Sequence, residues 1–71
     1  MPYINIKITD EAVTNEQKAQ LIKGTTQLMV DVLGKSPVTT MVVIDEVNTD
    51  NWGIGYQQVT ELRAEAQNGT N

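Results

Sequence analysis

The 71-residue sequence contains no cysteine, no histidine and no phenylalanine, and it has a single serine, Ser36. Without cysteine there are no disulfides, and without cysteine and histidine the usual zinc sites cannot form. The same absences exclude the Ser-His-Asp and Cys-His arrangements of nucleophilic catalysis. An enzyme of this composition must use a less common catalytic group, and we expect no metal in it.

Other absences disfavour several classes of partner. Neither G-x-G-x-x-G nor G-x-x-x-x-G-K-S/T occurs, so no nucleotide-binding loop is expected. No apolar run approaches the roughly 20 residues of a membrane span, and no signal segment precedes the first strand pattern, so we expect a cytoplasmic protein with no membrane partner. The net charge of −4 disfavours nucleic acid, which usually binds to a basic face.

Two segments have the pattern of β-strands. Residues 2 to 8 carry isoleucine at every second position from Ile4, which predicts a strand with one apolar face. Residues 39 to 46 contain the unbroken apolar run from Met41 to Ile44, which predicts a strand with apolar side chains on both faces. Both faces of this second strand therefore need a cover.

A long amphipathic helix is predicted between the strands, from about Asn15 to Leu33. Thr14 and Gln17 have the spacing of a capping box at its start, and Gly34 is a natural stop at its end. Spacings of three and four place its apolar residues in one stripe that we expect to face the sheet. The stripe consists of Leu21, Ile22, Thr25, Leu28, Met29, Val32 and Leu33.

The remainder of the chain reads as short elements of the same single domain, residues 1 to 71. A turn at 48 to 51 precedes Trp52 to Tyr56, a tight bend or small hairpin whose glycines permit positive φ. Residues 57 to 66 are predicted to form a short helix, and 67 to 71 a polar tail that frays.

The order strand, helix, strand predicts an α+β fold, in which a β-α-β crossover joins two parallel strands. One helix covers only one face of such a sheet. A single core in a chain this short rarely supplies more than about 3–5 kcal/mol of stability, and neither disulfides nor zinc can supplement it. We therefore expect a homo-oligomer, in which another subunit covers the second face.

Pro2 is the candidate for the catalytic group. Removal of Met1 would leave it with a secondary amine, which can act as a base. A generic α-amino group has a pKa of about 7.7–8.0, so burial or a nearby cation would be needed to keep the amine uncharged near neutrality. The alternative is that Pro2 merely begins an edge strand, where its missing N–H costs nothing.

Four short motifs follow one another up to about Gly55: M-P-Y-I-N-I-K-I, T-N-E-Q-K, V-V-I-D-E and W-G-I-G. In this order the sequence resembles the 4-oxalocrotonate tautomerase family. The resemblance implies β-α-β subunits that pair into a four-stranded sheet with two helices, commonly with three such dimers in a hexamer. It also implies a tautomerase that needs no cofactor and acts on a small-molecule substrate.

The same resemblance assigns two site residues. Pro2 would be the general base and then the acid, moving a proton between carbon and oxygen of an enol or dienol acid. Trp52 occupies the place of an aromatic residue that lines the pocket in the family. The alternative for Trp52 is an ordinary core or interface anchor.

Two arginines of the family are missing. Members that act on dicarboxylates have one in the loop after the first strand and one in the second strand, but here residues 9 to 13 are T-D-E-A-V and residues 41 to 43 are M-V-V. Carboxylate binding would then fall to Lys7, Lys35 or Arg63 of this or a neighbouring subunit, unless these are solvated surface charges. The substrate is therefore not fixed by the sequence.

Two hypotheses follow for the function. The first is a tautomerase that acts on a small 2-oxo or unsaturated acid. The second, favoured by the missing arginines, is a non-catalytic oligomer-forming module or the partner subunit of an active homologue. A glycosidase or cation site at Asp10-Glu11 or Asp45-Glu46 is disfavoured, because adjacent residues on a strand point to opposite faces.

Overall fold

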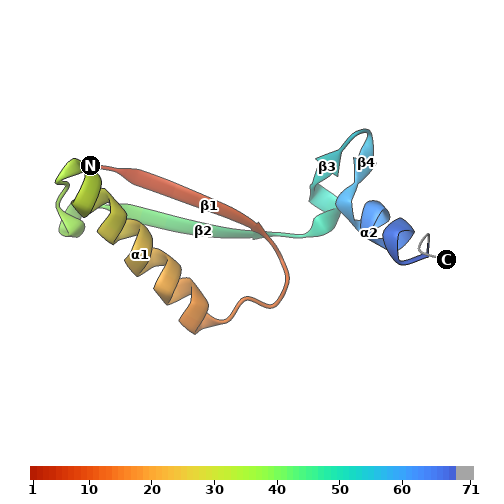
Figure 1. The fold of residues 1–71 in the computed structure, drawn as a ribbon, viewed down its shortest axis with the longest axis horizontal. Coiled ribbons are helices and arrows are strands. Elements are labelled where there is room, and N and C mark those ends of the chain that lie inside the picture. The colour runs from red at the N-terminus through yellow and green to blue at the C-terminus, as the bar shows by residue number, and fades with distance from the viewer. Residues whose placement is uncertain (69–71) are drawn as a thin grey trace.

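The chain folds into a β-α-β unit followed by a smaller C-terminal unit, in a computed structural model that describes residues 1–68 (Figure 1). Strands β1 (Tyr3–Thr9) and β2 (Met41–Val47) form a parallel two-stranded sheet. Helix α1 (Asn15–Leu33) connects them, and the 3-10 turn η1 (Pro37–Thr39) leads from the helix into β2. The predicted β-α-β order is confirmed.

The ends of α1 form as their local signals predict. The N–H of Gln17 donates to the Thr14 hydroxyl at 3.1 Å, and the N–H of Thr14 donates to the Gln17 side chain at 2.9 Å. Gly34 closes the last turn at φ 64°, in the left-handed region that glycine adopts without steric cost. The predicted bounds, Asn15 and Leu33, are those of the structure.

One face of the sheet lies toward α1. The register places Val42 and Ile44 on the same face as the isoleucines of β1, because paired residues of parallel strands point to the same side. Glu46 belongs to this face and forms an ion pair with Lys18 of α1, which identifies it as the face under the helix. The predicted stripe on α1 is wider than this contact, since Leu28, Val32 and Leu33 remain more than half exposed.

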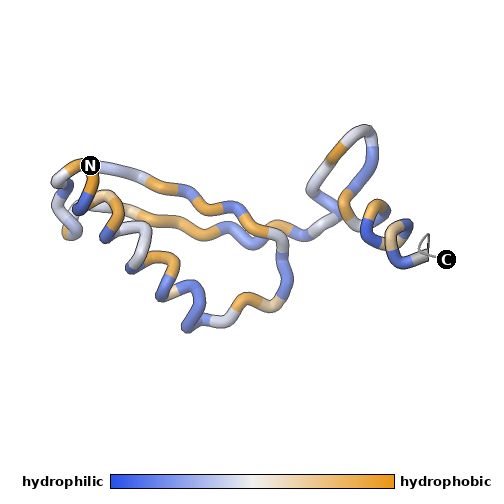
Figure 2. Tube along the Cα trace, in the orientation of Figure 1, coloured by the Kyte–Doolittle hydropathy of each residue, from blue (hydrophilic) through white to orange (hydrophobic). Residues whose placement is uncertain are grey.

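The opposite face has no cover from the described residues. Tyr3, Met41 and Val43 lie on it and are 63%, 51% and 39% exposed. Figure 2 shows the reason in the sequence: hydropathy alternates along β1, whereas the first half of β2 is continuously hydrophobic. A strand with apolar residues on both faces cannot be satisfied by one helix.

The C-terminal unit is a small hairpin followed by a helix. Its elements are η2 (Thr49–Asn51), β3 (Gly53–Ile54), β4 (Gln57–Gln58) and α2 (Val59–Asn68). Strands β3 and β4 are antiparallel, and the two turn residues between them both have positive φ, 55° for Gly55 and 74° for Tyr56. Two positive φ values are typical of the two-residue hairpin turns that match strand twist.

Most departures from the predicted boundaries are small. Both long strands are shifted by one or two residues, and the predicted bend from Trp52 is a hairpin. The residue with positive φ beside Gly55 is Tyr56, not Gly53. Helix α2 continues to Asn68, two residues beyond its predicted end, and the rest of the predicted tail, 69 to 71, lies outside the described residues.

The isolated chain is extended and lacks a core. No residue among 1 to 67 is buried, and the molecule measures 51 × 25 × 17 Å with a radius of gyration of 16.5 Å. A compact domain of this length has a radius of gyration of about 11 Å. Among the described helices, none has the length and apolar character needed to cross a membrane.

Candidate functional site

Pro2 lies just before β1, at the end of the sheet to which the C-terminal end of α1 leads (Figure 1). Its carbonyl accepts a hydrogen bond from the N–H of Met41 at 2.9 Å, which fixes the start of the parallel pair. Pro2 is partly exposed, whereas Met1 is 84% exposed. With Met1 attached, the Pro2 nitrogen is an amide and has no basicity.

Trp52 lies beyond the other end of the sheet, after β2 and η2. Its indole N–H donates to the carbonyl of Val47 at 3.0 Å, and its own carbonyl accepts from the N–H of Val59 at 2.8 Å. The side chain thus joins the end of β2 to the C-terminal unit. This satisfies its polar atom locally, as expected for an anchoring tryptophan.

Pro2 and Trp52 therefore do not meet within one chain. They lie beyond opposite ends of β1, whose seven residues span roughly 23 Å at about 3.3 Å per residue. If both line one pocket, the two side chains must come from different copies. Both remain predicted site residues, and their separation follows from the parallel pairing of the strands that they flank.

A cluster of polar contacts surrounds the Trp52 end of the sheet. The carbonyl of Val47 accepts from the indole of Trp52 and also from the N–H of Asp10, at 3.1 Å. The next residue, Glu11, accepts from Arg63 of α2 and from the hydroxyl of Thr9. The hydrogen bond from Arg63, and after it the one from Thr9, lowers the pKa of Glu11 below its ordinary value.

The other carboxylates of interest are paired with cations on opposite faces of the sheet. On the uncovered face, Asp45 accepts from Asn5 at 2.8 Å and from Lys7 at 3.0 Å. These bonds, led by that from Asn5, lower the pKa of Asp45. Glu46 accepts from Lys18 under the helix, and its pKa is lowered mainly by that bond.

No metal site results from these carboxylates. Asp45 and Glu46 diverge as adjacent strand residues do, and among residues 1–68 no group of three or more acidic ligands is placed to hold a metal ion. Each acidic side chain of the pair has a cationic partner instead. The geometry therefore does not support Asp45 and Glu46 as a catalytic carboxylate pair.

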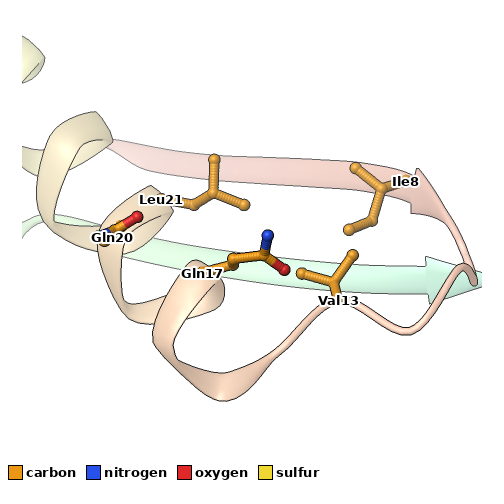
Figure 3. Close-up of a pocket in the computed structure, with 5 residues that line it drawn as sticks. All are labelled: Ile8, Val13, Gln17, Gln20 and Leu21. Atoms are coloured by element: carbon orange, nitrogen blue, oxygen red, sulfur yellow. The ribbon is translucent and has the colours of Figure 1, made fainter.

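Two open depressions lie near the Trp52 end of the sheet. The larger, about 440 Å³, lies between the first half of α1 and the end of β1 and is mainly apolar (Figure 3). Its lining residues are Ile8, Val13, Gln17, Gln20 and Leu21. The smaller, about 340 Å³, includes Trp52 and the hairpin residue Tyr56 in its wall. Pro2 lines neither of them.

The three candidate cations for binding a substrate carboxylate lie at different places in the fold. Lys7 is bound to Asp45 on the uncovered face, and Arg63 to Glu11 at the Trp52 end. Lys35 follows the end of α1, where its N–H donates to the carbonyl of Met29 at 3.3 Å. Within the described part of the chain, these three cations therefore do not converge on one site for a dicarboxylate.

Known proteins support a family assignment. Residues 2–62 match the family model described as Tautomerase enzyme. The chain is 65% identical over 66 residues to "Probable tautomerase K2" of Dickeya dadantii, covering 93% of this chain and 98% of that protein. It is 27% identical to the 2-hydroxymuconate tautomerase of Bacillus subtilis, covering 87% and 98%.

Solved structures agree with the sequence relatives. The crystal structure of DmpI from Helicobacter pylori superposes with a TM-score of 0.82 at 49% identity, covering 89% of this chain and 97% of that one. TomN, a 4-oxalocrotonate tautomerase homologue, gives a TM-score of 0.82 at 25% identity, covering 89% and 95%. The predicted resemblance is confirmed, and the chain belongs to the tautomerase family.

Proposed function

We propose that this chain is a cofactor-independent tautomerase that interconverts the enol and keto forms of a small 2-oxo or unsaturated acid. The observation that carries the proposal is the position of Pro2, directly before β1 in a chain of the tautomerase family that has no histidine or cysteine. After removal of Met1, the secondary amine of Pro2 can act as a base near neutrality.

The proposed reaction transfers one proton and leaves no net change in composition. The uncharged Pro2 nitrogen accepts the proton of the enol hydroxyl while the O–H bond breaks. The resulting ammonium ion then gives a proton to the substrate carbon: the electrons of the C=C π bond form the new C–H bond, and the C–O bond becomes the carbonyl C=O. The amine is regenerated, so no external acid, base or oxidant is consumed.

The proposed active form is a homo-oligomer with composite sites. Two chains would pair into a four-stranded sheet with two helices, and three such dimers would form a hexamer. Support comes from the uncovered sheet face and from the roughly 23 Å between Pro2 and Trp52 within a chain. A neighbouring copy would bring Trp52 to the pocket of Pro2, as its proposed substrate-binding residue.

A second candidate is a non-catalytic oligomer-forming module or partner subunit. The loop after β1 and the strand β2 lack arginine, which favours this candidate. Losing a preorganised donor at a developing oxyanion typically costs about 100- to 1,000-fold in rate. A related protein that lacked both these arginines and a basic Pro2 nitrogen would retain only its ability to form an oligomer.

Pro2→Ala tests the proposal on protein whose loss of Met1 is verified by mass spectrometry. Ketonisation of 2-hydroxymuconate and of phenylenolpyruvate is followed by absorbance, and we expect Pro2→Ala to lower kcat/KM by at least about tenfold, since general acid–base groups contribute about 100- to 10,000-fold. Pro37→Ala, at the start of η1, is the matched control and should leave the rate within about twofold. Equal rates for both variants would remove Pro2 from the mechanism and favour the second candidate.

A further inference from the structure

Arg63 provides the only guanidinium group of the chain. It extends from α2 and donates through Nη1 to Oε1 of Glu11, while the Thr9 hydroxyl donates to Oε2 of the same carboxylate. Both oxygens of Glu11 are therefore held. The two side chains are about half exposed, 50% for Arg63 and 51% for Glu11, so a ligand can reach them.

The Glu11–Arg63 pair adjoins Trp52 through shared backbone contacts. The carbonyl of Val47 accepts from the N–H of Asp10, beside Glu11, at 3.1 Å and from the indole of Trp52 at 3.0 Å. Val59, the first residue of α2, donates to the carbonyl of Trp52 at 2.8 Å. Hydrogen bonds at the end of β2 thus connect the loop that carries Glu11, Trp52 and the start of the helix that carries Arg63.

This inference rests on the proposed function, in which Trp52 lines the Pro2 pocket of a neighbouring copy. Glu11 and Arg63 then reach the same pocket with Trp52. A free guanidinium would bind a substrate carboxylate through two parallel hydrogen bonds. Here Glu11 occupies Arg63 and adds a negative charge of its own, so a second carboxylate on the substrate meets competition and repulsion.

We propose that the Glu11–Arg63 pair determines substrate specificity, by selecting enol acids with one carboxylate and an apolar distal group over dicarboxylates. The apolar part of such a substrate would lie against the ring of Trp52. The low pKa of Glu11 keeps its carboxylate ionised at neutral pH, so the selection operates under ordinary assay conditions.

The test compares one dicarboxylate with one monocarboxylate on the Met1-free protein. We measure kcat/KM for 2-hydroxymuconate and for phenylenolpyruvate and take the ratio of the two. Glu11→Gln should raise this ratio at least about fivefold, because it frees the Arg63 guanidinium and removes the opposing negative charge. Glu16→Gln, an exposed residue in the first turn of α1, is the control and should leave the ratio within about twofold.

A second variant shows whether Glu11→Gln acts by freeing the Arg63 guanidinium or by breaking the link between the loop after β1 and α2. Arg63→Gln leaves the Glu11 charge uncompensated and should lower the ratio by at least about threefold. In the double variant Glu11→Gln, Arg63→Gln, the gain from Glu11→Gln should disappear. A purely structural role would change both substrates in proportion and leave the ratio unmoved.

The outcomes distinguish this inference from the proposed function. If Pro2→Ala reduces the rate but neither pair variant moves the ratio, the specificity role is wrong and the tautomerase proposal stands. If the Met1-free protein ketonises neither substrate, or does so independently of Pro2, both are overturned. Sedimentation of each variant shows whether it assembles. If Glu11→Gln does not assemble, the ratio measured for Arg63→Gln decides whether the pair determines specificity.

Discussion

Most cationic residues of this chain are paired with carboxylates. Three of the five cationic side chains bind carboxylates within the described residues, as Lys7–Asp45, Lys18–Glu46 and Arg63–Glu11. All three pairs join segments far apart in the sequence. A substrate carboxylate must therefore compete with internal carboxylates for the cations that the chain offers.

Trp52 also contributes to stability, which can be measured apart from catalysis. Trp52→Phe keeps an aromatic ring but removes the indole N–H, so the carbonyl of Val47 retains only its bond from Asp10. We expect a loss of about 0.5–1.5 kcal/mol in the free energy of unfolding, as for one hydrogen bond. Urea unfolding at fixed protein concentration measures it. An unchanged free energy would show that this bond does not hold the C-terminal unit.

At the residue scale the sequence was informative about identity and silent about partners. Pro2 stands out because of its chemistry at the chain start, and Trp52 because of its place before G-I-G. The pairing of Arg63 with Glu11 joins residues 52 positions apart, and no local pattern marks such a contact. The catalytic role of Pro2 is a prediction for the Pro2→Ala kinetics above, and the substrate-binding role of Trp52 stays a prediction.

Among the elements, α1 was the most predictable, because the signals for its ends are local. The capping box of Thr14 and Gln17 and the stop at Gly34 each depend on a few adjacent residues. The hairpin was less predictable. Its turn places the fully exposed Tyr56 at φ 74°, a backbone conformation that is usually adopted by glycine or asparagine. Periodicity gives no indication of such a residue.

The contact between α1 and the sheet should depend on pH through Glu46. Its pKa lies below the ordinary 4.5 because Lys18 donates to it. A carboxylate whose pKa falls on folding stabilises the fold above its unfolded pKa, and this contribution is lost as the pH falls through the lowered value. The thermal midpoint should therefore drop less for Glu46→Gln than for the unaltered protein below about pH 4.5.

Glu16→Gln is the matched control for this measurement, since it makes the same chemical change on the exposed start of α1. It should follow the unaltered protein through the acid range. If Glu46→Gln did so too, the Lys18–Glu46 pair would contribute nothing to the attachment of the helix.

At the scale of the whole molecule, the single chain exposes more surface than a compact domain of its size. It exposes 5438 Å², whereas a compact folded monomer of 7.8 kDa exposes about 4,400 Å². The uncovered sheet face and the C-terminal unit, which extends from the β-α-β body, contribute to this excess of exposed area (Figure 1). Two-stranded sheets are marginal alone, so we expect other copies to supply the missing cover.

Sedimentation velocity at micromolar concentration tests this expectation. We predict a species near six times the 7.8 kDa chain mass. Val43→Asp, which places a charge on the uncovered face, should shift the population toward smaller species, because an unpaired charge is costly to bury. A folded monomer of the unaltered protein at this concentration would contradict the assembly.

The sequence predicted the fold of the subunit far better than the site. Strand and helix patterns are properties of neighbouring residues, so β1, α1 and β2 could be located closely. The proposed pocket, with Pro2 from one chain and Trp52 from another, would have no such local pattern. Only the separation of these residues along β1 shows that copies must share it, if both take part.

The most direct measurement of the central claim is the titration of the Pro2 nitrogen in the assembled, Met1-free protein. Nitrogen-15 NMR would follow its protonation while kcat/KM for phenylenolpyruvate is measured over the same pH range. We predict one midpoint for both, below the roughly 7.7–8.0 of an ordinary terminal amine, with the rate rising as the amine loses its proton. An amine that titrates in the ordinary range while the rate does not follow it would contradict catalysis by Pro2.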